Sequence, residues 1–371
     1  MFIEGIHTKM IKALYVHIPF CWHICYYCDF SRCIYEKALA DRYLTHLNKE
    51  IDLIQQDSFE TIYIGGGTPT SLNYEQLERL LNMLSRFKNV KEYTIEVNPE
   101  TFDRDKATLL KQYGVNRVSL GVQTFDEALL KEIGRKHTNK DVYDTLSYLE
   151  EVGIKNRSID LMFGFSSQGL SNVISDLKQA VMLPIQHISI YDLEVYPHSK
   201  LGLSGYQKAD DETTFLMYQT IIEFLNSHSY KQYETSNFAI STFESLHNKT
   251  YWYYQDYLGV GLSACGKVGR TRFENTSNFV DYLKDDYCKE KTRLTIDDVI
   301  FEAIMMNLRL NEGIDINKFD DRFSCNILEK YHQPIEKNIN RGLLEVKNSH
   351  LKTTEKGIYV LNDILIDFMD Q

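Results

Sequence analysis

Residues 15–30 read YVHIPFCWHICYYCDF and hold three cysteines, Cys21, Cys25 and Cys28, at the spacing C-x3-C-x2-C. The apolar run at residues 13–18 predicts a buried strand. Pro19 ends that strand, because proline has no N–H to donate to a ladder. Three thiolates close together in a loop suit a soft metal or an iron–sulfur cluster. With three protein ligands, one iron of a four-iron cluster is left open to an exogenous ligand.

The same cysteines could instead form a disulfide framework or a zinc site. Seven cysteines in 371 residues are too sparse and too clustered for a disulfide framework. A zinc knuckle with His17 or His23 as fourth ligand fits the spacing, since C-x2-C pairs are common in zinc sites. Cys33 is a further candidate for the fourth ligand, and we expect it not to bind. The chain that follows favours a cluster with a nucleoside cofactor.

The amino-acid composition limits the classes of protein to which this chain can belong. A chain of 371 residues with 43% hydrophobic residues has room for one large and one smaller domain. The formal net charge of −11 argues against a broad nucleic-acid-binding surface. No apolar run approaches the length of about twenty residues that spans a bilayer, and residues 1–12 lack the apolar core of a signal peptide. We expect a cytoplasmic protein, where thiols stay reduced; peripheral membrane association and a homodimer are left open.

Short apolar segments alternate with amphipathic segments up to residue 228. After the strand at 13–18 and a helix near 39–54, we expect strands at 61–64, 93–97, 117–123, 158–163 and 186–191, and helices at 74–87, 103–113, 126–133, 139–151, 171–182 and 210–228. Strand then helix, repeated about six times, predicts a parallel sheet. Right-handed crossovers would curl that sheet into a partial or full α/β barrel.

A glycine-rich loop, Gly65-Gly66-Gly67-Thr68, directly follows the expected strand at 61–64. Glycines in that place allow positive φ or a close approach of another group to the backbone. On a purely structural interpretation, the loop is a tight turn. On a functional interpretation, its bare N–H and C=O groups hold the charged end of a small molecule.

Polar residues also stand where such barrels gather their ligands, at the carboxyl ends of strands. Glu96 and Gln123 end two expected strands, and Asp160 lies within the next one. A buried acid needs a partner, because an unpaired charge is costly to desolvate. That partner is either a ligand's hydroxyl groups and charged end, or one of the arginines Arg117, Arg135 and Arg157. Arg135 also suits a ligand carboxylate, because a guanidinium fork fits that group.

Together these motifs resemble the oxygen-independent coproporphyrinogen III oxidase-like family of radical S-adenosylmethionine (SAM) proteins, for which C-x3-C-x2-C is a signature. The resemblance covers nearly the whole chain through GGGTP (65–69), EVNP (96–99), GVQT (121–124), GRKH (134–137), IDL (159–161) and HNKTYW (247–252). Within the family it resembles the HemW-like heme chaperones. The oxidases carry C-x3-C-x2-C-x-C, where this chain has Phe30, and a longer segment than the fourteen residues before Tyr15.

The resemblance implies a 4Fe–4S cluster on Cys21, Cys25 and Cys28, with SAM on its open iron. Contacts to SAM are expected from Tyr15, Gly66, Gly67, Thr68, Glu96, Gln123, Arg135 and Asp160, with Tyr27 and Cys265 as further candidates. It also implies heme as a bound group and apo-hemoproteins as acceptors.

The motif H-N-x-x-Y-W supplies the leading candidate for a heme ligand, His247, because imidazole is a common axial ligand. The alternative is a structural histidine, with Tyr251 and Trp252 in the core. Cys265 stands where relatives of this branch usually have histidine. A thiolate can itself ligate heme, so Cys265 is a second candidate.

By the same resemblance we expect residues 1–290 to form a radical SAM domain, a partial (β/α)6 TIM-like barrel, and residues 291–371 a HemN-type C-terminal domain. The latter should be mainly helical and winged-helix-like, with helices at 297–308, 327–339 and 355–368 and a hairpin at 342–354. Without a basic reading helix it suits a lid or partner-docking role better than DNA binding. The expected function is heme binding and delivery. The alternatives are an oxygen-independent coproporphyrinogen III oxidase, which we disfavour, and another radical SAM enzyme that modifies heme.

Overall fold

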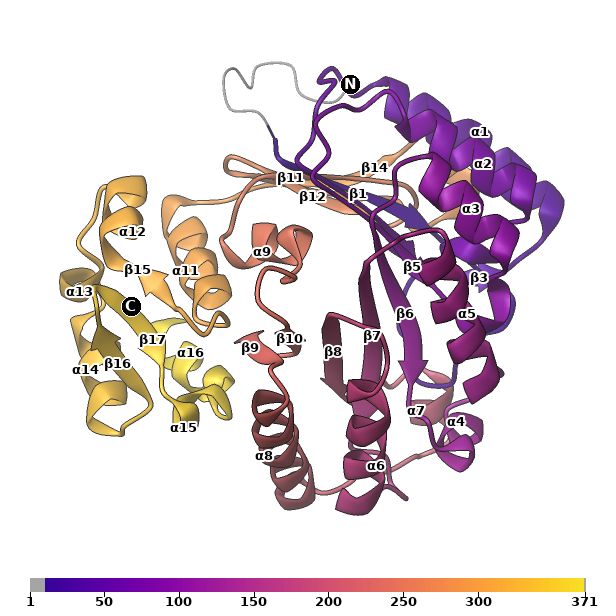
Figure 1. Ribbon diagram of the computed structural model, residues 1–371. Helices are drawn as coiled ribbons and strands as arrows, with labels where there is room; N and C mark the ends of the chain where they lie inside the picture. The colour runs from indigo at the N-terminus through magenta and orange to yellow at the C-terminus, as the bar shows by residue number, and fades with distance from the viewer. Residues whose placement is uncertain (1–10, 370–371) are drawn as a thin grey trace.

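The computed structural model describes residues 11–369 and contains a twelve-stranded sheet of order β14-β13-β12-β11-β1-β4-β5-β6-β7-β8-β10-β9. Its six central strands are β1 (Ala13–Ile18), β4 (Thr61–Gly66), β5 (Glu92–Val97), β6 (Arg117–Gln123), β7 (Asn156–Phe163) and β8 (His187–Asp192). All pair in parallel, and the sheet curls as an open barrel (Figure 1). The predicted partial barrel is confirmed.

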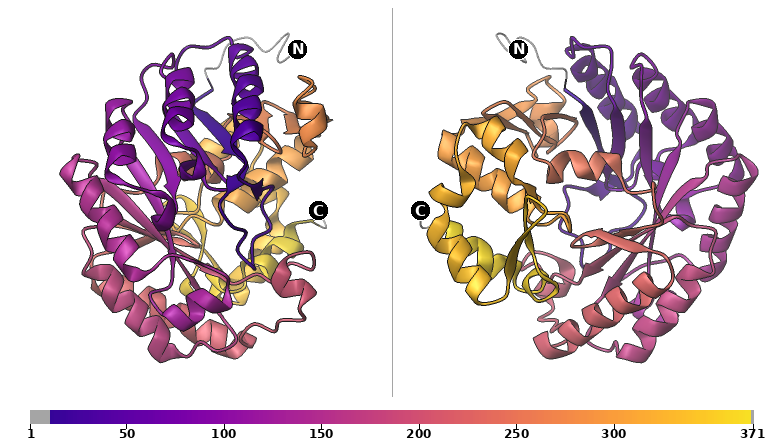
Figure 2. Two further views of the ribbon diagram at one scale, coloured as in Figure 1. Left: turned by 90° about the vertical axis from the view of Figure 1, so that its right-hand side faces the viewer. Right: turned by 60° about the vertical axis from the view of Figure 1, so that its left-hand side comes forward.

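Helices cover the outer face of the curled sheet, as Figures 1 and 2 show. They are α1 (Lys37–Asp52), α2 (Tyr74–Leu84), α3 (Arg104–Gln112), α4 (Glu127–Glu132), α5 (Asn139–Glu151), α6 (Leu170–Val181), α7 (Lys200–Leu203) and α8 (Asp211–Ser227), with 3-10 turns at Pro69–Ser71 and Pro99–Thr101. Local sequence explains several of their starts. Asn73 with Gln76 and Thr138 with Asp141 form capping boxes at α2 and α5.

Six short strands, most of them paired antiparallel, extend the sheet at both ends, and the sequence did not predict them. β11 (Tyr257–Val260) pairs in parallel with β1, followed by β12 (Cys265–Val268), β13 (Thr271–Asn275) and β14 (Cys288–Arg293). At the other end lie β10 (Asn237–Ala239) and β9 (Lys231–Glu234). These strands have six residues at most, and β14 reads CKEKTR with mostly exposed side chains. A short polar strand carries no apolar pattern by which a sequence reveals it.

The C-terminal domain has its own hydrophobic core, which includes Ile304, Ile314 and Leu351. It comprises α11 (Ile296–Asn307), β15 (Ile314–Asp315), α12 (Ile316–Phe323), α13 (Ile327–Lys330), α14 (His332–Asn340), β16 (Leu344–Lys347), β17 (His350–Thr353), α15 (Glu355–Ile358) and α16 (Leu361–Met369). The helices with the sheet β15-β17-β16 form the expected winged-helix-like arrangement. The helix predicted at 327–339 is two helices that meet at Tyr331, with Pro334 in the first turn of the second. The domain boundary after residue 290 stays a prediction.

The two domains meet at the end of the H-N-x-x-Y-W motif. That motif forms the short helix α9 (Leu246–Trp252), beside which the C-terminal domain lies (Figures 1 and 2). Asn307 Nδ2 donates to the carbonyl of Trp252 at 2.7 Å, and Arg322 Nη1 donates to that of Tyr253 at 3.0 Å. The guanidinium of Arg309 lies 5.6 Å from the centroid of the Trp252 ring. Trp252 is therefore a domain contact, which a purely local interpretation of the motif misses.

No helix of the described chain has the length and apolar character needed to cross a membrane.

A buried carboxylate ties α1 to the extended end of the sheet. Glu50 is 2% exposed. Its Oε2 accepts hydrogen bonds from the Gly261 amide at 2.9 Å and from the hydroxyl of Tyr282, in α10 (Phe279–Tyr282), at 2.6 Å. Its Oε1 accepts from Asn275 Nδ2 at 2.6 Å. Gly261 lies against the backbone of β1, since a β-carbon there would be 2.6 Å from the His17 carbonyl. Glu50 thus holds the loop after β11 against β1, which leads into residues 18–30, called the cysteine segment below.

Glu50→Ala should destabilise the barrel strongly. The substitution leaves three donors without their acceptor, and each buried unsatisfied group costs about 1–3 kcal/mol, so the free energy of unfolding should fall by about 3 kcal/mol or more. Urea unfolding measures this change. Asp52→Ala is the control on the same helix: Asp52 makes an exposed ion pair with Arg86, and such pairs contribute about 0–1 kcal/mol. Equal midpoints for the two variants would contradict this role of Glu50.

Candidate functional site

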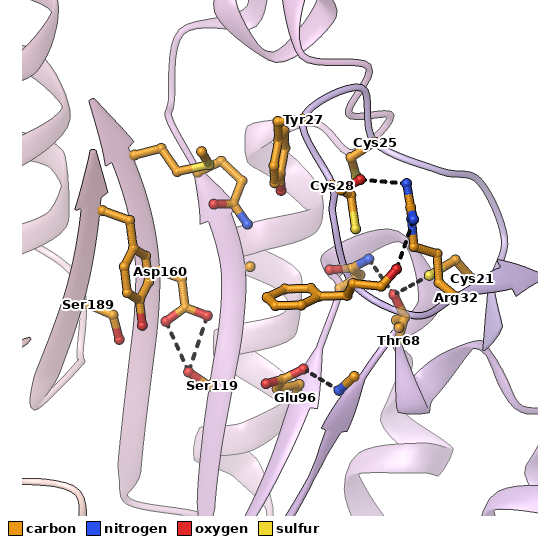
Figure 3. Close-up of a pocket in the computed structure, with 18 of the residues that line it drawn as sticks. Cys21, Cys25, Tyr27, Cys28, Arg32, Thr68, Glu96, Ser119, Asp160 and Ser189 are labelled. Atoms are coloured by element: carbon orange, nitrogen blue, oxygen red, sulfur yellow. Dashed lines mark hydrogen bonds between the residues drawn. The ribbon is translucent and has the colours of Figure 1, made fainter. Parts of the chain in front are cut away.

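A cavity of ≈ 380 Å³ opens at the carboxyl ends of the parallel strands. The cysteine segment forms one wall, and side chains from neighbouring strands form the other (Figure 3). Of the residues expected at the site, the structure brings eleven together there: Cys21, Cys25, Tyr27, Cys28, Gly66, Gly67, Thr68, Glu96, Gln123, Arg135 and Asp160. Tyr15, His247 and Cys265 are not among the residues that line it.

The three thiols are free and face one cavity. Cys21 ends β2 (Phe20–Cys21), which pairs with β3 (Cys33–Ile34), and the Cys28 amide donates to the Cys25 carbonyl at 3.3 Å. Polar groups already donate to two sulfurs: Thr68 Oγ1 lies 3.7 Å from Cys21 Sγ, and Arg135 Nη1 lies 3.6 Å from Cys25 Sγ. Hydrogen bonds to sulfur are a common feature of iron–sulfur sites.

The alternative fourth ligands have other partners. His17 bonds through Nε2 to the carbonyl of Ser31 at 2.8 Å and through Nδ1 to Tyr15 at 3.0 Å, while His23 lies 3.2 Å from Glu100. Cys33 does not line the cavity. In the described part of the chain, no three His, Cys, Asp or Glu side chains, the three thiols included, are grouped as ligands of one metal ion. His17 and His23 are engaged with other groups, while the three thiols line one cavity.

The glycine loop packs directly on the cysteine segment. The Gly67 amide donates to the Ile18 carbonyl and the Thr68 amide to the Phe20 carbonyl, both at 2.8 Å. A β-carbon on Gly67 would lie 2.8 Å from the Phe20 carbonyl oxygen and 3.0 Å from Cys21 Sγ. Gly66 has φ +115° and would place a β-carbon 2.6 Å from the His17 ring. Only glycine fits either position.

Two partly buried carboxylates at the floor of the cavity have neutral partners. Glu96 accepts from the Tyr63 hydroxyl at 2.8 Å and from the Gly66 amide at 3.1 Å. Asp160 accepts from Ser119 Oγ at 3.1 Å (Figure 3). Burial raises the pKa of Glu96 to about 7 and also raises the pKa of Asp160. Both acids are therefore poised to receive a cation or hydroxyl donors from a ligand.

The arginines considered as partners for these acids are engaged elsewhere. Arg117 donates to Asn156 at 2.9 Å, and Arg157 pairs with Glu150 at 3.5 Å. Arg135 donates to Asn98 Oδ1 at 3.0 Å and to the Gly121 carbonyl. None of these contacts involves Glu96 or Asp160, so the structural ion pairs considered from the sequence are absent among the residues described.

A hydrogen-bonded chain joins two of the thiols. From Cys25 it runs through Arg135 to Asn98, then from Asn98 Nδ2 to Thr68 Oγ1 at 2.8 Å, and from Thr68 to Cys21. Burial lowers the pKa of Arg135, but the neighbouring Cys25 and Tyr27 raise this pKa by more than burial lowers it. The guanidinium therefore stays charged. A buried permanent cation beside the thiols fits an anionic cluster or a ligand carboxylate.

Sequence reasoning missed several lining residues that strand geometry identifies. Alternate residues of a strand face one side. In β6 the lining residues are Arg117, Ser119, Gly121 and Gln123, and in β8 they are Ser189 and Tyr191 with the terminal Asp192. Tyr63 of β4 and Asn98 beyond β5 also line the cavity. Counting in steps of two from Gln123 would have found the β6 set.

The three expected residues outside the cavity lie behind it or on its far side. The Tyr15 ring stacks on Tyr63, with centroids 6.1 Å apart. His247 is 1% exposed, and its ring nitrogens lie 2.8 Å from Thr61 Oγ1 and 2.8 Å from the Tyr251 hydroxyl. Burial lowers the pKa of His247 to about 3.

The other members of these motifs lie differently. Asn248 and Ser245, rather than His247, line the cavity. Glu92 accepts from the His247 amide at 2.8 Å and from the Leu246 amide at 3.0 Å, which fixes the start of α9. Cys265 is exposed at the start of β12, with Sγ 3.9 Å from the Ser263 carbonyl.

Known proteins match this chain over almost its whole length. Residues 15–180 match the family model of the radical SAM superfamily, and residues 294–360 match that of the HemN C-terminal domain. Heme chaperone HemW of Lactococcus lactis subsp. lactis is 35% identical over 370 residues, covering 96% of this chain and 97% of the relative. The chain belongs to the HemW family. Heme chaperone HemW of Bacillus subtilis is 33% identical over 378 residues, covering 97% and 100% of the two chains.

A solved structure supports the fold independently. Coproporphyrinogen III oxidase (HemN) from Escherichia coli, a radical SAM enzyme, superposes with a TM-score of 0.85 at 24% identity, covering 96% of this chain and 90% of that one. Membership of the radical SAM superfamily implies a 4Fe–4S cluster and SAM. The donor set fits both groups, because three thiols, a buried guanidinium and two unpaired acids face one cavity.

Gly67→Ala should prevent stable assembly of the cluster. The added β-carbon would meet backbone and Cys21 Sγ at 3.0 Å or less, so the cysteine segment must shift. We expect most of the iron and its visible absorbance to be lost after anaerobic reconstitution. Gly169→Ala is the matched control, since a β-carbon there meets no atom closer than 3.7 Å. Full iron content in Gly67→Ala would contradict the role given to this contact.

Binding of SAM should strengthen as pH rises through the pKa of Glu96, about 7. The raised pKa means that the carboxyl is protonated below this value and ionised above it, and the ionised form attracts the cofactor's ammonium group. Calorimetric titration of the reconstituted protein between about pH 6 and pH 8 measures the effect. Glu96→Gln should bind more weakly without this rise. Glu60→Gln, which alters a partly exposed carboxylate paired with Lys91, should behave as wild type. A pH-independent affinity of the wild type would refute this assignment.

Proposed function

We propose that this protein is a heme chaperone, which binds heme and passes it to apo-hemoproteins. The observation that carries the proposal is the identity of 35% and 33% with two relatives named heme chaperone HemW, across 96% and 97% of this chain. The match includes both the barrel and the C-terminal domain. Neither a homodimer nor membrane association finds support in these comparisons, and neither is part of the proposal.

The cluster and SAM would support binding or release of heme. When bound, the cluster would supply an open iron as the place where SAM binds. The chain's own residues would hold the cofactor: Glu96 would receive its ammonium group, Arg135 its carboxylate, and Asp160 its ribose hydroxyls. The contacts of Glu96 and Asp160 with neutral donors support these assignments, because both acids lack a cationic partner among the described residues.

The sequence offers two candidate ligands for the heme iron, His247 and Cys265. The two side chains differ in how accessible they are in the structure. His247 would have to exchange its contact with Thr61 or with Tyr251, because both ring nitrogens are engaged. Cys265 is exposed and could reach a ligand without rearrangement. Both remain proposals.

The second candidate function is an oxygen-independent coproporphyrinogen III oxidase. The full-length likeness to HemN, with a TM-score of 0.85, favours it. Phe30 counts against it, because the resemblance places a fourth cysteine there in the oxidases.

Two assays on the full-length, anaerobically reconstituted protein separate the candidates. In the first, the heme-loaded protein is mixed with apomyoglobin; we expect the Soret band of holomyoglobin to appear. In the second, coproporphyrinogen and SAM are supplied with a reductant; we expect no vinyl product. Heme binding without transfer to any apo-hemoprotein would contradict the proposed delivery of heme. Formation of a vinyl product would contradict the chaperone proposal and support the oxidase.

A further inference from the structure

We propose that heme docks at the mouth of the cavity, between the cysteine segment and the loop after β8, with His198 as a ligand to its iron. This inference rests on the proposed function, because it gives a place to the same cargo. It names a residue that belongs to none of the motifs discussed above.

The mouth of the cavity carries an unusual group of exposed apolar side chains. Ile24 and Phe30 of the cysteine segment are 37% and 66% exposed, and Tyr196 of the loop after β8 is 40% exposed. All three line the cavity. Exposed apolar side chains that border a cavity indicate a ligand surface. Two aromatic rings suit a flat, apolar macrocycle.

The two loops that carry these side chains touch each other. The Leu201 amide donates to the Tyr26 carbonyl at 2.9 Å, and Lys200 Nζ lies 3.5 Å from the centroid of the Tyr26 ring. His198 Nε2 is bonded to Asp29 Oδ1. His198 itself does not line the cavity, but Asp29 does. The centroid of the His198 ring lies 6.2 Å from that of the exposed Tyr196 ring, which places the imidazole beside the mouth.

The imidazole of His198 has the surroundings of a metal ligand. Its side chain is 67% exposed, and one ring nitrogen is bonded to the Asp29 carboxylate. The other ring nitrogen has no hydrogen-bond partner among the described residues. A carboxylate on one nitrogen orients the ring and leaves the other nitrogen free to bind iron, as at many metal-bound histidines. Imidazole is a common axial ligand of heme iron.

Other histidines near the cavity are less accessible. His23 lines it, but its side chain is 22% exposed and pairs with Glu100 at 3.2 Å. His247 is 1% exposed, with both nitrogens engaged. His198 can therefore meet an incoming iron without breaking internal packing.

The polarity of the cavity separates two binding regions. Its floor carries Glu96 and Asp160, which suit the polar groups of SAM. Its mouth carries the apolar side chains, which suit a porphyrin. Two cations lie beside that mouth: Lys200, and Arg32, whose Nη1 donates to the Phe30 carbonyl at 2.8 Å. Heme carries two carboxylates, which pair favourably with such cations.

Heme titration of the full-length reconstituted protein tests the inference. His198→Ala should weaken heme binding by at least about tenfold and shift the Soret band, and added imidazole should restore the wild-type spectrum. His332→Ala is the matched control: its side chain is 64% exposed and lies 3.7 Å from Glu336, far along the chain in the C-terminal domain. This control should bind heme as wild type does.

Metal-free protoporphyrin IX separates the iron ligand from the apolar surface. His198→Ala should bind this porphyrin as wild type does, whereas Phe30→Ala should weaken binding of both porphyrins. Ile366→Ala, at a residue 56% exposed in the C-terminal domain, is the control for loss of an exposed apolar side chain.

The failures of the two proposals are distinguishable. If the wild-type protein binds no heme, the proposed function fails and this inference fails with it. If the wild type binds heme and His198→Ala binds it equally with an unchanged spectrum, only the present inference is overturned. The same holds if the spectrum changes in His247→Ala or Cys265→Ala but not in His198→Ala.

Discussion

Direct backbone contact between two loops is the constraint on which the site depends. The Gly67 and Thr68 amides bond to the carbonyls of Ile18 and Phe20, and no side chain fits between the two loops at Gly67. The cysteine segment is thus held by main chain rather than by adaptable side chains. The parallel register that pairs Val16 with Ile64 and Ile18 with Gly66 delivers both loops to the same edge of the sheet. The position of the thiols is therefore a consequence of the barrel itself.

The charged side chains at this edge of the sheet are not paired with one another, so they are available to a ligand. Glu96 and Asp160 are partly buried and bonded to hydroxyl and amide donors, and Arg135 is buried against carbonyl, amide and sulfur acceptors. Internal ion pairs would have neutralised these groups. Their separation stores a desolvation cost that a zwitterionic ligand can relieve by meeting both signs of charge. The same wall carries exposed aromatic side chains at its rim, which gives one cavity a polar floor and an apolar mouth.

The sequence predicted the elements whose hydrophobic residues recur with a clear helical or strand periodicity. Buried strands such as 13–18 and 117–123 and the helix at 139–151 were placed with their observed bounds. The strands β9 to β14 were missed, because each has six residues at most, and the exposed, polar β14 carries no apolar pattern. For the cavity, motifs located Cys21 and Glu96 but not Ser119, whose role follows from strand alternation. His247 could not be placed from its motif, because its contact with Thr61 joins residues 186 positions apart in the chain.

The most direct test of the central claim is the electron paramagnetic resonance spectrum of the reduced, anaerobically reconstituted protein, recorded with and without SAM. A cluster with three cysteine ligands and one open iron should show a 4Fe–4S signal whose g-values change when SAM is added. A protein that holds zinc in place of the cluster, or a 4Fe–4S signal that SAM leaves unchanged, would contradict the account.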